Sequence, residues 1–212
     1  MKTFDISAID AMAKIPRLNL INCVTGYKSA NLIGSCSKEG VLNVTIFSSI
    51  THLGSNPALL GFIIRPIATT PRDTYNNIRD NQYFTVNHIT SSMIADAHHT
   101  SSAYESSISE FDKTNLESEF LDGSKVPFVK NSPVRVLCKY VSEYPITENG
   151  CIHLIASIEK IYVQDELVHK ENWIRLDLAE VVCINGLDGY STPKLIDRFE
   201  YARPDQPTKS ML

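Results

Sequence analysis

The pattern of apolar and polar positions predicts a chain made mainly of β-strands. Residues 43–48 alternate: Asn43, Thr45 and Phe47 occupy one face of a strand, opposite Val44, Ile46 and Ser48. Residues 58–64 are apolar on both faces, which predicts an interior strand. Further strands are expected at 17–24, 32–37, 83–88, 134–144, 151–163 and 181–184.

The helices predicted between these strands are few and short. The most distinct begins at Pro71 and runs to Asn81. Thr70 suits its N-cap, proline suits the first helical position, and Asp73 stands where a capping box has its carboxylate. Other helical pieces are expected at 8–14, which Pro16 would end, and at 91–98, 109–113 and 176–180.

Two connections have clear turn chemistry. Residues 38–40 end in Gly40 and predict a hairpin into the strand at 43–48. Asn149-Gly150 predicts a turn between the two long strands 134–144 and 151–163. These two strands offer more apolar surface than one small barrel needs to cover, so we expect the protein to form a homodimer.

Composition narrows the class of protein. The chain has 212 residues, 43% of them apolar and 21% charged, and shows no repeat or linker, so we expect one domain over 1–212. The net charge of −4 argues against nucleic acid as a partner. Five cysteines without a CxxC pair indicate a reduced, cytoplasmic protein. No apolar run approaches the roughly 20 residues that cross a bilayer.

Several common sites are disfavoured by their missing motifs. The chain has neither GxGxxG nor GxxxxGK[ST], so a Rossmann or P-loop site is not expected. Adjacent His98 and His99 lack a carboxylate at ligand spacing, and we predict no metal site. Ser101 and Ser102 lie near His99 but without a GxSxG elbow, which disfavours a hydrolase.

A phosphate site is the candidate that the residues themselves favour. Ser48 and Ser49 end a strand with two hydroxyls and free N–H groups, which is a plausible anion cradle. Arg72 and Thr74 lie on the first turn of the predicted helix, where the N–H groups carry partial positive charge. An ordinary capped surface helix is the alternative for that segment.

The order of several short motifs resembles the flavin reductase-like family, whose fold is the FMN-binding split β-barrel. The resembling segments are 43–49, 56–57, 72–74 with 77–78, 83–87, 99–104, 109–111, 186–190 and 201–204. The resemblance implies a mainly β, Greek-key split barrel with a few short helices. It also implies a homodimer with the flavin near the interface, and a polar loop at 100–111 that closes the site.

The resemblance assigns roles to named residues. It implies that FMN receives hydride from NAD(P)H, and we name no catalytic side chain because the flavin performs the chemistry. Ring and ribityl contacts are expected from Asn43, Thr45, Phe47, Ser48 and Ser49. The phosphate contacts are expected from Arg65, Arg72 and Thr74. For Arg65 a simple ion pair is the alternative.

His153 is the candidate for contact with the nicotinamide. Many family members carry a Gly-Asp-His motif at the start of a strand, where this chain has Gly150 and His153 without the Asp and with spacing that differs by one. A half-buried strand histidine is the alternative reading. A non-catalytic FMN-binding electron carrier or ligand-sensing flavoprotein, or a related barrel with another cofactor, also fits the pattern. The choice between NADH and NADPH stays open.

Overall fold

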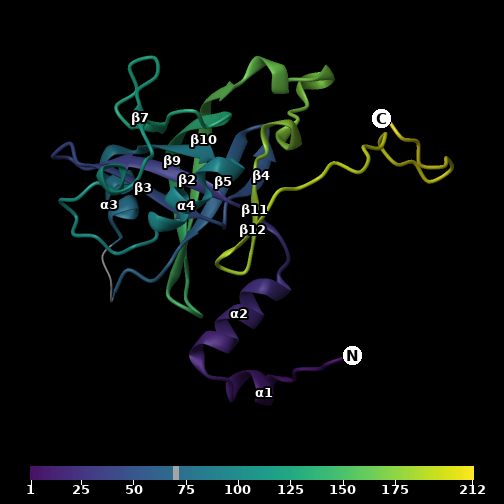
Figure 1. Ribbon diagram of the computed structural model, residues 1–212, viewed down its shortest axis with the longest axis horizontal. Helices are drawn as coiled ribbons and strands as arrows, with labels where there is room; N and C mark the ends of the chain where they lie inside the picture. The colour runs from purple at the N-terminus through teal and green to yellow at the C-terminus, as the bar shows by residue number, and fades with distance from the viewer. Residues whose placement is uncertain (69–71) are drawn as a thin grey trace.

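An antiparallel sheet of seven strands forms the body of the protein (Figure 1). The structure, a computed structural model, describes residues 1–68 and 72–212. In chain order the strands are β2 (Asn31–Cys36), β3 (Leu42–Phe47), β4 (Thr51–Ser55), β5 (Ala58–Ile64), β6 (Tyr83–His88), β9 (Val134–Ile146) and β10 (Cys151–Val163). Their order across the sheet is β3-β2-β6-β9-β10-β5-β4.

The connection between β3 and β4 shows that this sheet closes into a barrel. The two strands are the opposite edges of the sheet, yet only Ser48, Ser49 and Ile50 separate them in the chain. Seven flat strands would place the edges about 29 Å apart. The three-residue link reaches about 14 Å at most. The sheet must therefore curl until β3 and β4 approach each other, and residues 48–50 lie at the resulting seam.

The interior of the barrel is an apolar cluster with residues from every strand of the sheet except β4. Phe62 of β5 and Phe84 of β6 are fully buried, with their ring centroids 5.5 Å apart. Phe47 packs edge-on against Phe62 at 5.2 Å, across the seam. Ile33 and Leu154 complete the same cluster from β2 and β10. Residues 58–64 thus form an interior strand as predicted, because β5 has β10 on one side and β4 on the other.

Helix α3 (Asp73–Asn81) lies against β2 and β3 and places Ile78 in the barrel core. The described helix begins at Asp73, with Arg72 as N-cap and no capping bond from its side chain. The predicted cap Thr70 and first residue Pro71 lie outside the described residues. Asp73 is therefore the first helical residue here, whereas the capping-box prediction gave it the third position.

Shorter elements pack around the outside of the barrel. Helix α4 (Ile94–His99) and a small sheet of β1 (Lys28–Ser29), β11 (Cys183–Asn185) and β12 (Gly189–Ser191) cover a second apolar cluster. The remaining pieces are η1 (Ser91–Met93), η2 (Glu110–Lys113), η3 (Asp165–Leu167), η4 (Lys170–Asn172), η5 (Leu176–Ala179), β7 (Ser118–Glu119) and β8 (Phe128–Val129).

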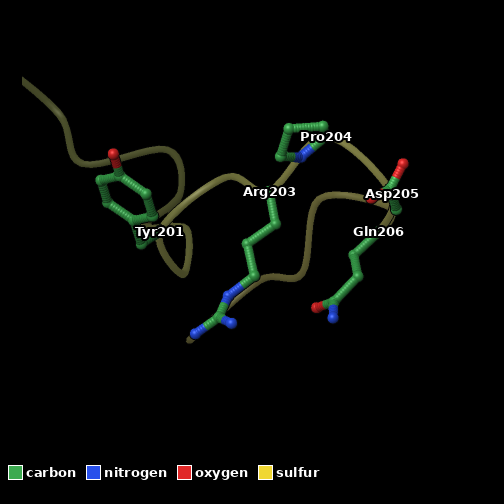
Figure 2. Close-up of a pocket in the computed structure, with 5 residues that line it drawn as sticks. All are labelled: Tyr201, Arg203, Pro204, Asp205 and Gln206. Carbon is green, nitrogen blue, oxygen red and sulfur yellow. The ribbon is translucent and has the colours of Figure 1, made fainter.

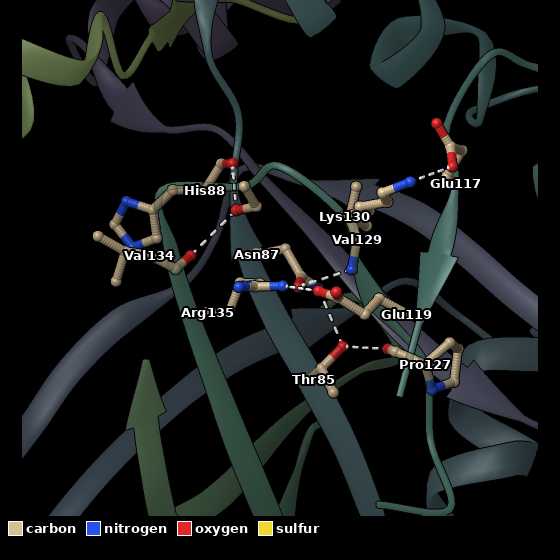
Figure 3. Close-up of polar contacts among 11 residues, drawn as sticks. Thr85, Asn87, His88, Glu117, Glu119, Pro127, Val129, Lys130, Val134 and Arg135 are labelled. Atoms are coloured by element: carbon tan, nitrogen blue, oxygen red, sulfur yellow. Dashed lines mark hydrogen bonds and ion pairs between the residues drawn. The ribbon is translucent and has the colours of Figure 1, made fainter. Parts of the chain in front are cut away.

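Buried polar residues of β6 fasten the segment that carries β8 to the barrel (Figure 3). The Thr85 hydroxyl donates to the Pro127 carbonyl at 2.6 Å, and Asn87 accepts from the Val129 N–H at 3.0 Å. Asn87 also donates to Thr85 at 2.9 Å. Gly34 on the neighbouring β2 leaves the space that this approach needs: a Cβ there would lie 2.2 Å from the Pro127 oxygen.

The N-terminal region corrects one prediction. Residues 17–24 are not a strand but belong to helix α2 (Lys14–Val24), which follows the short helix α1 (Ile6–Asp10). Pro16 does not end a helix. It lies in the first turn of α2, where its missing N–H has no helical partner to lose. Asp5 caps α1 by accepting from the Ala8 N–H at 2.8 Å.

Both ends of the chain extend away from the barrel (Figure 1). The two terminal arms, as we call residues 1–27 and 192–212, pack little against it, and neither α1 nor α2 has a buried residue. The C-terminal arm folds back on itself through a bridge between Phe199 and Ser210. It contacts the body where Arg198 stacks on Trp173, with its guanidinium carbon 4.5 Å from the ring centroid.

Candidate functional site

The barrel seam brings three predicted residues to one region. The Ser49 hydroxyl accepts a hydrogen bond from the Ile63 N–H of β5 at 3.0 Å. The pairing between β4 and β5 ends at Gly61, so Ile63 lies beyond the part of β5 that β4 covers. The corner formed by Ser48 and Ser49 therefore lies beside the end of β5, where exposed Arg65 follows. Within the described part of the chain, the hydroxyls of Thr45 and Ser48 make no side-chain hydrogen bond.

A second pair of predicted residues meets at the end of the barrel under α3. The Thr74 hydroxyl donates to the Asn43 side-chain oxygen at 2.8 Å. Ser35 of β2 donates to the same oxygen at 3.1 Å, and Asn77 of α3 donates to Ser35 at 3.1 Å. These four side chains are buried. The hydrogen-bonding groups of Asn43 and Thr74 are thus used within the protein.

Glu110 completes this buried cluster, and it was absent from the predicted site residues. Both of its carboxylate oxygens accept from the Asn43 amide nitrogen at 3.0 Å, and one also accepts from the Val44 N–H at 3.0 Å. The side chain is 6% exposed, and no cation pairs with it among the described residues. Burial raises the pKa of its carboxyl above the ordinary value, and nearby Asp73 adds to the rise. The only sequence signal for Glu110 was its place in the 109–111 motif.

The loop 100–111 holds the free edge of β3 through two of its side chains. Glu110 accepts from the Val44 N–H, and the Thr100 hydroxyl accepts from the Ile46 N–H at 3.0 Å. These are alternate residues of an edge strand, whose outward N–H groups otherwise lack partners. The predicted closing loop is therefore fixed at both of its ends to the strand that carries the candidate site.

Arg72 presents a buried polar atom without a partner. Its Nε makes no hydrogen bond within the described residues, although solvent does not reach that atom. Its neighbour Asp73 accepts from the Ser106 hydroxyl at 2.9 Å. The next residue, Asp73, lines a cleft of about 470 Å³ between the β2–β3 hairpin, α3 and residues 106–108. Asn43 also lines this cleft, but Arg72 does not. An anion at Arg72 would supply the acceptor that Nε lacks.

Phe47 is placed by packing. Its ring faces the barrel core against Phe62, on the same strand face as Asn43. Core burial accounts for an aromatic residue at this position, so the structure adds no support to its predicted contact with the flavin ring.

His153 lies half-buried on β10, opposite Ile63 of β5 and Tyr144 of β9. Its neighbours Ile152 and Leu154 belong to the barrel core, so its side chain points to the outer face. The ring covers Gly61, because a Cβ on that glycine would meet His153 Nε2 at 2.5 Å. Since the Ser49 hydroxyl bonds Ile63, His153 lies one strand away from the seam.

A hollow in the C-terminal arm carries no site, because it is lined only by exposed residues of the arm itself, among them Tyr201 and Arg203 (Figure 2). In the part of the chain that the structure describes, no group of three or more His, Cys, Asp or Glu residues could hold a metal ion. Nor is any helix in that part long and apolar enough to cross a membrane.

Known structures resemble this one over almost their full length. A proposed flavin reductase with a split barrel domain from Shewanella frigidimarina is 39% identical, with a TM-score of 0.91 over 95% of this chain and 100% of that one. Nitrilotriacetate monooxygenase component B from Bacillus cereus is 22% identical, with a TM-score of 0.80 over 95% and 98% of the two chains. An FMN-binding protein from Thermus thermophilus is 14% identical, with a TM-score of 0.68 over 91% and 96%.

These similarities confirm the predicted mainly β split barrel, with the last two showing the fold alone. The model of the flavin reductase like domain matches residues 25–176, which is most of the chain and includes every strand of the barrel. The chain therefore belongs to the flavin reductase-like family.

Proposed function

We propose that this protein binds FMN and transfers hydride from NAD(P)H to flavin. The observation that carries the proposal is Arg72, whose buried Nε finds no partner among residues 1–68 and 72–212 and which lies at the start of α3 without capping it. A cation next to free helical N–H groups favours a phosphate. FMN ends in a single phosphate, and the Thermus thermophilus relative is an FMN-binding protein.

The chain's own residues would bind and orient the cofactor. Arg72 would donate to the phosphate from the start of α3, and Arg65 would approach it from the end of β5. Thr45, Ser48 and Ser49 lie along β3 and the seam, where hydroxyls and backbone groups suit the ribityl chain and ring. When bound, FMN supplies the hydride-accepting chemistry.

The proposed nicotinamide contact is His153. It lies on the outer face of the barrel and pairs with Ile63, whose N–H bonds Ser49 at the seam. Both imidazole nitrogens of a half-buried histidine can hydrogen-bond to a carboxamide. The packing of His153 on Gly61 fixes the ring, which is the property that an orienting residue needs.

The test of the function is an assay of the purified protein with NADH and, separately, NADPH. The expected result is a yellow protein that releases FMN on denaturation and oxidises at least one nicotinamide in proportion to added free flavin. Released FAD would contradict the choice of cofactor. Bound FMN without oxidation of either nicotinamide would identify instead the electron carrier or ligand sensor.

We also propose that the protein works as a cytoplasmic homodimer of one-domain chains. All five cysteines are unpaired, as in a reducing compartment. The chain exposes 13,006 Å², whereas a compact monomer of 23.7 kDa exposes about 9,800 Å². Several exposed apolar side chains lie on the terminal arms, and others lie on β9 and β10. A second copy would cover this surface.

Substitutions on α2 test the dimer. Leu18 and Ile21 are exposed in the single chain. We expect Leu18→Glu or Ile21→Glu to convert dimer to monomer in light scattering. Because a two-fold contact contains each residue twice, losing one buried apolar side chain per copy costs about 3 kcal/mol, or roughly a hundredfold in affinity.

The matched control is Phe120→Glu, which places the same charge on an exposed apolar residue outside the arms and should leave the dimer intact. A monomeric wild-type protein in the presence of FMN would contradict the proposed dimer. Variants at Leu18 and Ile21 that both stay dimeric would exclude α2 from the contact.

A further inference from the structure

We propose that Glu110 is a positioning residue for the phosphate end of the FMN site. It acts through Asn43 of β3, which in turn holds Thr74 on the first turn of α3. This inference rests on the proposed FMN binding. Glu110 does not itself face the phosphate, because its carboxylate would repel the phosphate. Glu110 instead determines where the residues around Arg72 stand.

The first step is the bond between Glu110 and Asn43. Both carboxylate oxygens accept from the Asn43 amide nitrogen at 3.0 Å. An amide can present either its NH₂ or its oxygen to a neighbour, and hydrogen bonds decide between the two orientations. A carboxylate only accepts, so it holds the NH₂ end towards itself. The Asn43 oxygen is then directed the other way.

The second step is the bond between that oxygen and α3. The Asn43 oxygen accepts from the Thr74 hydroxyl at 2.8 Å and from Ser35 at 3.1 Å. Thr74 lies in the first turn of α3, two residues after Arg72, and it is buried. If the Asn43 amide rotated, its NH₂ would meet the Thr74 hydroxyl and the bond that holds this turn would change. Arg72, the N-cap of the same helix, would shift with it.

The burial of Glu110 shows why the arrangement is specific. Glu110 is 6% exposed, and its carboxylate oxygens accept from the N–H groups of Asn43 and Val44. A buried charge without a cation is costly unless hydrogen bonds compensate it. A charged side chain is not needed to pair the free N–H groups at the edge of β3, because the neutral hydroxyl of Thr100 accepts from the Ile46 N–H. The additional contact made by Glu110 is the one to Asn43.

The experiment compares Glu110→Gln with Thr100→Val by titration with FMN and riboflavin. A glutamine NH₂ would face the Asn43 NH₂, so we expect FMN to bind about tenfold more weakly and riboflavin, which lacks the phosphate, less than about threefold. Thr100→Val removes the other bond to the β3 edge and should lower the melting temperature while leaving the ratio of the two affinities unchanged. Equal losses for both ligands in Glu110→Gln, or none, overturn the inference.

A double-mutant cycle with Arg72→Ala measures whether Glu110→Gln changes the ratio of FMN to riboflavin affinity. A general loss of stability would not change this ratio. In the Arg72→Ala background the Glu110→Gln change should no longer affect FMN selectively. A selective loss that persists there overturns the route through Arg72. If Glu110→Gln does not fold, Glu110→Asp, which keeps the charge on a shorter side chain, carries the same comparison. A wild-type protein that binds no FMN refutes the proposed function itself, whereas FMN binding with an intact ratio in Glu110→Gln refutes only this inference.

Discussion

Arg72→Ala is expected to weaken FMN binding by roughly ten- to more than a hundredfold. The guanidinium lies at the start of α3, and its buried Nε has no partner in the part of the chain that the structure describes, so a phosphate there would gain a charge-assisted hydrogen bond. Such a bond is worth about 1.5–3 kcal/mol. Riboflavin has no phosphate, and its affinity should change much less. Titration of the two ligands into the same variant measures the difference.

Arg79→Ala is the matched control for this experiment. Arg79 lies on the last turn of the same helix and pairs with Glu143 at 2.7 Å, so its loss removes an equal charge away from the site. It should leave the ratio of FMN to riboflavin affinity unchanged. Thr74→Ala should reduce FMN affinity selectively but less than Arg72→Ala, because it removes only the hydrogen bond to Asn43 that holds the first turn of α3. Equal losses of both ligands in Arg72→Ala would remove Arg72 from the site.

Gly34→Ala is expected to lower the free energy of unfolding by about 1–3 kcal/mol. A Cβ at this position would lie 2.2 Å from the Pro127 carbonyl oxygen and 2.6 Å from the Thr85 hydroxyl. The first is a backbone atom, and the bond from Thr85 holds it in place (Figure 3). The strain therefore has no easy relief. For a chain of this size the melting temperature should fall by about 3–10 °C.

Gly54→Ala provides the comparison. Gly54 lies on the edge strand β4, and its Cβ would meet a single atom within 4 Å, the Pro57 oxygen at 3.1 Å. We expect the melting temperature of this variant to fall by less than half as much. Thermal unfolding followed by circular dichroism measures both. An unchanged melting temperature for Gly34→Ala would show that the β8 segment can move away from the barrel.

The long strands could be predicted because their signal is local. Residues 58–64 and 83–88 form β5 and β6 as predicted, and 151–163 forms β10. Continuous or alternating apolar residues reflect burial on two faces or one. The prediction of a strand at 17–24 is wrong because partial alternation also occurs within a helix, and because Pro16 stands in the first turn of α2, where proline is tolerated.

The candidate site was only partly accessible to the same reasoning. Side chains able to bind a phosphate or a ribityl chain could be named from their chemistry, as with Ser49 and Arg72. Glu110 could not, because its partner Asn43 is 67 residues away in the chain. A carboxylate in a polar loop has no pattern that distinguishes a solvated side chain from a buried one.

The sequence by itself determined the fold class and the family, and it named several of the polar residues proposed for the candidate site. Local periodicity and the order of motifs depend on residues that are close together in the chain, so they can be recognised without coordinates. Only the tertiary structure decided which of the polar groups are bonded within the protein and which remain available to bind a ligand. Closure of the sheet brings Ser49 to β5. The docking of α3 and the 100–111 loop occupies Asn43 and Thr74, whereas Arg72 Nε has no partner among the described residues. Hydrogen-bond partners depend on contacts between distant segments, and these exist only once the barrel has closed.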